Sequence, residues 1–114
     1  MTVQVGEKLH IITRRLFEGD LRRHFAGVVE EVTGTIIRVR GYVFVFDEGV
    51  NEFVRRNEER RRLFSVSDAG LVINILPLET EVEDLRYKMN DLANRVLTDG
   101  KTFSLNISEF SSTR

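Results

Sequence analysis

Arginines and aromatic residues alternate along one segment, and this alternation could carry binding chemistry. Every second side chain there is basic or aromatic: Arg38, Arg40, Tyr42, Phe44 and Phe46. In a strand these side chains share one face, provided that no bulge at Gly41 exchanges the two faces. Such rings can stack on the bases of a single-stranded nucleic acid while the guanidinium groups meet its phosphates. The alternative, which we favour, is a second apolar layer under a C-terminal helix, with the arginines at its rim.

A second candidate contact segment spans residues 55–62. Five arginines occur within these eight residues: Arg55, Arg56, Arg60, Arg61 and Arg62. A planar guanidinium group suits phosphates and carboxylates. Two glutamates inside the segment offset part of its charge. A solvated loop or a charged strand edge is therefore the simpler interpretation, because charge often protects sheet edges.

The composition limits the partners and cofactors that we expect. The chain has 17 Lys and Arg against 18 Asp and Glu, so no overall field attracts nucleic acid or anionic lipid. There is no cysteine, which excludes disulfides, thiolate zinc sites, iron–sulfur clusters and a cysteine nucleophile. We expect no metal and no cofactor.

Few residues suggest an enzyme. The only histidines, His10 and His24, lie on separate predicted strands. A histidine in such a position is more often a hydrogen-bonded structural residue than a base or a ligand. Neither a Gly-x-Ser-x-Gly elbow nor a glycine-rich phosphate loop is present. We therefore assign no catalytic residue, although a pocket lined by acids and a histidine would favour a small hydrolase or isomerase.

The elements that position these residues are mainly strands. Hydrophobic residues recur with a period of two through the first two thirds of the chain. Gly27 interrupts this pattern and indicates a bulge or a close approach of two backbones. The predicted strands cover residues 7–17, 24–33, 35–47, 50–54, 63–67 and 71–76.

After Pro77 the hydrophobic period changes to that of a helix. The apolar positions Val82, Leu85, Met89, Leu92 and Val96 recur at steps of three and four residues. Thr80 and Glu83 resemble a helix capping box. We favour one long helix here. The alternative is a short helix at 81–85 followed by strands at 86–89 and 93–98. In either case Asp99-Gly100 turns the chain into a last strand at 103–108, which would form a hairpin with 95–98 if that segment is extended.

Together these patterns predict a mainly β protein. We expect a small antiparallel barrel or rolled sheet of six to eight short strands with one helix in the C-terminal half, or an α+β fold if that helix is long. Residues 1–110 should form a single domain, and residues 111–114 a disordered tail. We find neither a secretory signal nor a membrane span, so we expect a cytoplasmic protein without membrane contact.

The most consistent function is a non-catalytic binding or assembly module. Its contact surfaces would be the arginine–aromatic face and the arginine segment, and it could self-associate as a homodimer. The alternative is a protein that binds single-stranded nucleic acid or a nucleotide through the same arginines. No family, ligand, partner, oligomeric state or strand order follows from the sequence.

Overall fold

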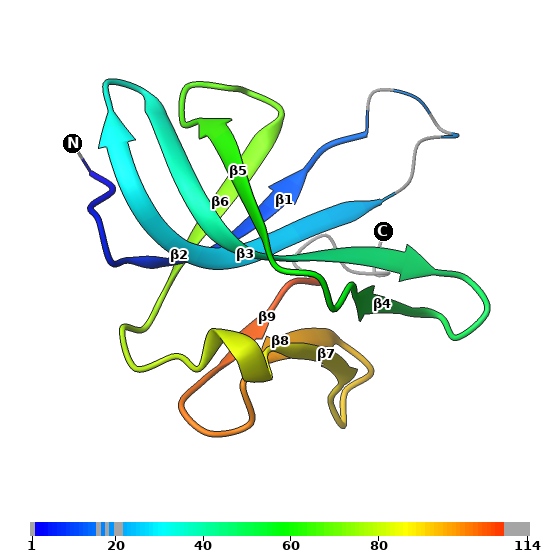
Figure 1. Cartoon of the computed structure of the whole chain (residues 1–114). Helices are drawn as coiled ribbons and strands as arrows, with labels where there is room; N and C mark the ends of the chain where they lie inside the picture. Colours follow the sequence, from blue (N-terminus) through cyan, green and yellow to red (C-terminus); the bar gives the residue numbers. More distant parts are fainter. Residues whose placement is uncertain (1, 16, 18, 20–21, 109–114) are drawn as a thin grey trace.

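The computed structural model describes residues 2–15, 17, 19 and 22–108, and these residues form two antiparallel sheets (Figure 1). The larger sheet contains β1 (Lys8–Thr13), β2 (Arg23–Thr33), β3 (Ile36–Asp47), β4 (Glu52–Arg55), β5 (Arg60–Ser65) and β6 (Leu71–Leu76). The smaller sheet contains β7 (Arg86–Met89), β8 (Arg95–Thr98) and β9 (Ser104–Asn106). The predicted mainly β class is confirmed, but neither sheet closes into a barrel. The predicted tail at 111–114 lies outside the described residues.

The long strand β3 organises the larger sheet. The strand order is β4-β3-β2-β1-β6, and β5 pairs with the first half of β3 while β4 pairs with its second half. Gly27 of β2 faces Gly41 of β3, and a Cβ atom on either would overlap the opposite backbone. The close approach predicted at Gly27 is thus confirmed, whereas the register shifts between Val29 and Glu31 instead. Figure 1 shows β2 and β3 curving side by side.

Each face of the larger sheet has its own core. One face carries an aliphatic cluster with the rings of Phe25 and Phe64 at its edge. The opposite face carries aromatic side chains and is covered by the smaller sheet, whose Tyr87 and Leu97 are buried against it. The alternation of side chains along β1, β2 and β3 creates both faces at once.

The predicted long helix is wrong. Only one turn of 3-10 helix, η1 (Val82–Asp84), is present among the described residues, and strands β7 and β8 follow it. The side-chain oxygen of Asn90 accepts the backbone N–H groups of Leu92 and Asn94, and Ala93 has a positive φ of 62°. These turn-forming contacts reverse the chain where a helix would have to continue. Within the described residues no helix has the length and apolar character to cross a bilayer.

The alternative of two short strands is correct, with β7 at the predicted residues and β8 beginning at Arg95. Residue 80 is not the N-cap that we predicted, because Glu81 occupies that position and makes no side-chain cap bond. Instead, the carboxylate of Asp99 ties η1 to the turn between β8 and β9. It accepts the backbone N–H groups of Glu81, Lys101 and Thr102. Burial alone would raise the pKa of Asp99, but these hydrogen bonds hold it well below its ordinary value.

Candidate binding cavity

The arginine–aromatic face exists, but its rings are occupied. The five side chains from Arg38 to Phe46 share one face as predicted, and Gly41 does not exchange the sides. The aromatic ones form an apolar layer under the smaller sheet rather than under a helix. Phe44 is only 1% exposed. The guanidinium group of Arg55 lies 4.7 Å from the ring of Tyr42. Bases therefore find no free ring at Phe44, and an arginine already stacks on Tyr42.

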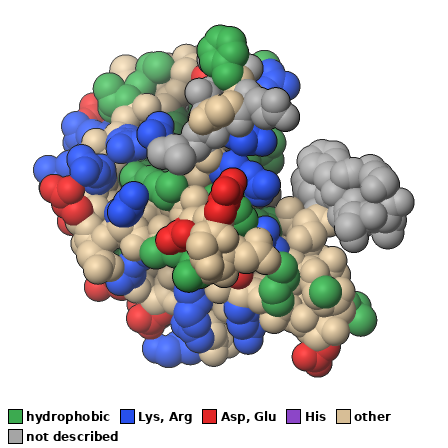
Figure 2. Space-filling model, turned by 90° about the vertical axis from the view of Figure 1, so that its right-hand side faces the viewer, with side chains coloured by type: hydrophobic (Ala, Val, Ile, Leu, Met, Phe, Trp, Pro, Cys, Tyr) green, Lys and Arg blue, Asp and Glu red, His purple; other side chains and the backbone are tan. Residues whose placement is uncertain are grey.

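Most of the predicted arginines form ion pairs on the surface. Glu30 holds three of them, Arg38, Arg40 and Arg61, at 3.2–3.3 Å. Arg40 also pairs with Glu59 at 2.9 Å, and Arg60 with Glu58 at 2.7 Å. On the face drawn in Figure 2, basic and acidic side chains are likewise interspersed.

The remaining predicted arginines form no ion pair with a described carboxylate. Arg55 donates to the backbone carbonyl of Glu83. Arg62 lies 5.9 Å from the ring of Phe25, and burial lowers its pKa. Arg56 is exposed. The nine predicted residues are therefore divided between surface ion pairs and the layer between the sheets. Their roles in nucleic-acid binding and self-association stay predictions.

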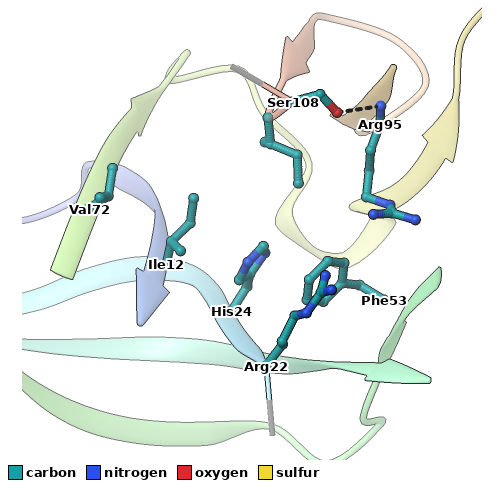
Figure 3. A pocket seen from close by; sticks show the side chains of 8 residues that line it. Ile12, Arg22, His24, Phe53, Val72, Arg95 and Ser108 are labelled. Carbon is teal, nitrogen blue, oxygen red and sulfur yellow. Dashed lines mark hydrogen bonds between the residues drawn. The ribbon is translucent and has the colours of Figure 1, made fainter. Parts of the chain in front are cut away.

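A cavity of about 250 Å³ lies between the two sheets, and none of its lining residues was a predicted site residue (Figure 3). Its lining combines apolar side chains with two arginines, a histidine and a serine: Ile12, Arg22, His24, Phe53, Val72, Arg95, Ile107 and Ser108. Figure 3 shows Ile12 and Val72 on one side of the cavity and Arg22, Phe53 and Arg95 on the other. The cavity thus has an apolar side and a basic side.

Counted over the described residues, the basic side carries a net positive charge. Arg95 donates to a carboxylate oxygen of Glu52 at 2.7 Å and to the backbone oxygen of Asn51 at 3.0 Å. Arg22 lies 4.5 Å from the ring of Phe46, and no described carboxylate lies within ion-pair distance of it. The hydroxyl of Ser108 accepts the backbone N–H of Arg95 at 2.9 Å, which leaves its own proton to donate (Figure 3). A single anionic group would complete this arrangement.

His24 connects the cavity to a buried hydrogen-bond chain. Its ring stacks on Phe53 with 4.1 Å between the ring centroids. Its Nδ1 atom lies 2.7 Å from the hydroxyl of Tyr87, and that hydroxyl lies 2.8 Å from Nε2 of His10. Nδ1 of His10 in turn lies 3.2 Å from the amide nitrogen of Asn74. Four strands, β1, β2, β6 and β7, therefore meet in one polar chain inside an otherwise apolar layer.

Burial keeps this chain neutral. Desolvation lowers the pKa of His10 from 6.5 to about 4. Desolvation, together with the charges of His10, Arg22 and Arg95, lowers the pKa of His24 to about 3. Desolvation raises the pKa of Tyr87 well above 10.0. At neutral pH both imidazoles are uncharged, and His24 is a weak base.

The proximity of the two histidines could not be predicted, because the register between their strands was unknown. His10 faces Ala26 across β1 and β2, and Ile12 faces His24, so the histidines are diagonal neighbours. The alternation of side chains along each strand can place both histidines on the same face of the sheet. The register between β1 and β2 does not follow from the sequence, because nine residues separate the two strands. Tyr87, which joins the histidines, lies in the segment that we assigned to a helix.

The described lining of the cavity offers hydrogen-bond donors and apolar contacts. Among the described residues the cavity lining contains a histidine but no acid, and the carboxylate of Glu52, which lies beside the lining, is paired with Arg95. Within the described part of the chain, no group of three His, Asp or Glu side chains could hold a metal ion. What remains is a set of hydrogen-bond donors beside an apolar wall.

A scan against protein-family models finds no match to this chain. Searches of the curated proteins and of the solved structures likewise find no match.

Proposed function

We propose that this protein is a non-catalytic binding module and that the cavity beside His24 is its binding site. Its ligand is a small molecule with an apolar body and one anionic group. The observation that supports this proposal is the meeting of Arg22, Arg95 and His24 on one side of an apolar cavity. Ligand sites in proteins commonly combine apolar walls with a few converging polar groups that fix orientation.

The charge of the site favours an anion. Arg95 is balanced by Glu52, whereas Arg22 has no carboxylate partner among the described residues. An anion placed between the two guanidinium groups would form charge-assisted hydrogen bonds in surroundings that are partly shielded from water. Because His24 is neutral, its ring adds a hydrogen bond without adding charge.

The size of the cavity limits the apolar body. A volume of 250 Å³ corresponds to about eight water molecules at roughly 30 Å³ each. A single aromatic ring or a branched aliphatic chain fits this volume and would contact Phe53, Ile12 and Val72. A dinucleotide or a large cofactor could place only part of itself in this volume.

The test is a two-dimensional NMR titration of the ¹⁵N-labelled protein with benzoate, using benzamide as a neutral ligand of the same shape. Benzoate at millimolar concentration should move the backbone signals of residues 12, 24, 53 and 72, and benzamide should bind at least fivefold more weakly. Arg22→Gln should weaken benzoate binding about tenfold, the effect of losing roughly 1.4 kcal/mol.

Arg61→Gln is the matched control, because Arg61 pairs with Glu30 on the surface far from the cavity lining. This variant should bind benzoate like the unaltered protein. If benzoate moves no cavity signal, or if both arginine variants weaken binding equally, the cavity is not an anion site.

A further inference from the structure

The hydroxyl of Tyr87 lies between a ring nitrogen of His10 and one of His24, and this position links the protonation of the two nitrogens. A phenol has one proton to donate and can also accept. Nε2 of His10 and Nδ1 of His24 both lie within 2.8 Å of this oxygen. One of the two nitrogens must therefore carry a proton and the other must not. The two imidazoles are coupled through Tyr87 and change tautomer together.

Asn74 fixes the direction of the chain. Its amide nitrogen can only donate, so Nδ1 of His10, at 3.2 Å, is the acceptor. His10 then carries its proton on Nε2 and donates it to the oxygen of Tyr87. Tyr87 donates its own proton to Nδ1 of His24. Because burial keeps both histidines neutral, the single proton of His24 is on Nε2.

Nε2 of His24 is the end of the chain that faces a ligand. Nδ1 is engaged by Tyr87, whereas no described residue forms a hydrogen bond with Nε2. Nε2 is also not among the fully buried atoms that lack a partner, so it is accessible from the cavity. His24 lines the cavity together with Arg22 and Arg95, the two cations that lie close enough to lower its pKa. With the hydroxyl of Ser108, every described polar side chain of the cavity lining can present a donor.

We propose that Asn74 is a positioning residue that holds the proton on Nε2 of His24 through His10 and Tyr87, and that the cavity therefore takes the deprotonated carboxylate of an aryl or branched aliphatic acid. This inference depends on the proposed function, because it specifies the anionic group of that ligand. One carboxylate oxygen accepts from Nε2 of His24, and the other meets the guanidinium groups. A primary amine would bring N–H groups against N–H groups and is rejected.

The direct test observes the protons without any ligand. Long-range ¹H–¹⁵N correlation of protein labelled with ¹⁵N-histidine distinguishes a protonated from an unprotonated ring nitrogen. At pH 7 both histidines should show a protonated Nε2 and an unprotonated Nδ1. A protonated Nδ1 on either neutral histidine would overturn the assignment.

Asn74→Leu tests the role of Asn74, since leucine has a similar size but no donor. The ring nitrogens of His10 and His24 should both move toward an average of the two tautomers, although Asn74 touches only His10. Benzoate affinity should fall by up to about twofold, in proportion to the loss of the competent tautomer. Asn57→Leu, at an exposed turn, is the control and should change neither readout.

The outcomes separate the two proposals. Unchanged ¹⁵N positions in Asn74→Leu would remove Asn74 from the mechanism even if benzoate binds. The expected tautomers without any benzoate binding would overturn the proposed function and leave the assignment of Asn74 standing. The tautomers of the unaltered protein are measured in either case, so the inference does not depend on the variant folding.

Discussion

The two faces of the larger sheet are built from the same three strands, β1, β2 and β3, yet they have different chemistry. On one face Leu9, Ile11 and Ile37 are fully buried and bring no polar side-chain atoms. On the other face, His10 of β1 and His24 of β2 are buried with Tyr87 and a set of aromatic rings. Each histidine is the chain neighbour of a residue that points to the aliphatic face. The first face holds the sheet together, and the second combines packing with a cavity.

The difference shows what a buried polar group requires. An aliphatic side chain packs against any neighbour of suitable shape, whereas a buried imidazole needs a partner for each polar nitrogen. The histidine face meets this requirement through Tyr87 and Asn74, except at Nε2 of His24, where the cavity begins. The ligand site thus lies where the internal hydrogen bonding of that face is incomplete.

The largest effect that we predict is a loss of stability in acid, which arises on the face that carries the histidines. The unfolded histidines titrate near 6.5, while the folded pKa values are about 4 for His10 and about 3 for His24. Their contribution to stability is complete above pH 6.5 and is lost as the pH falls toward the folded values, because only the unfolded chain then takes up protons. Lowering the pH from 7.5 to 5 should remove about 4 kcal/mol from the free energy of unfolding.

Urea denaturation at a series of pH values measures this loss. His24→Gln should remove about half of the dependence between pH 7.5 and 5, because one of the two titrating groups is gone. A flat stability profile in this range would mean that the histidines are solvated in the folded protein. The aliphatic face contributes nothing to the profile, since it carries no titratable side chain in its buried cluster.

Ile37→Ala should break the other face and leave the cavity unchanged. Ile37 is fully buried in the aliphatic cluster, and its side chain points away from the histidines. Truncation of such a side chain costs about 3 kcal/mol through lost contacts and a cavity. The urea midpoint should fall accordingly, while the histidine tautomers and the benzoate affinity, within twofold, should stay the same. Altered tautomers in this variant would show that the two faces are mechanically coupled.

The sequence predicted most strands because alternation is a local property. β3 covers all but one residue of the predicted 35–47 segment, and β6 matches the predicted segment at 71–76. The pairing of Gly27 with Gly41 was partly visible, since a glycine inside a strand indicates close backbones. The helix prediction failed because the spacing of Val82, Leu85 and Met89 fits a helix and a turn with two strands equally well. Asn90 and its side-chain contacts decide between them.

The cavity could not be predicted because it depends on long-range register. Its lining comes from five strands and the segments beside them, and its basic side joins Arg22 to Arg95, which are far apart in the chain. The arginines that we predicted as contact residues are close together in the chain, and a local pattern of this kind is visible in a sequence. In the structure, most of them pair with neighbouring glutamates.

The smallest effect that we predict sharpens the contrast between the cavity and that surface. Replacing Arg60, Arg61 and Arg62 together with serine should cost less than about 1 kcal/mol, because exposed ion pairs contribute little. Glu30 keeps Arg38 and Arg40 as partners at 3.2 Å, so no carboxylate is stranded in the interior. Urea denaturation should show a nearly unchanged midpoint, and benzoate should bind as before. A loss of several kcal/mol would instead mean that residues 60–62 support the fold. The contact responsible would be that of Arg62 with the ring of Phe25, which belongs to the aliphatic cluster.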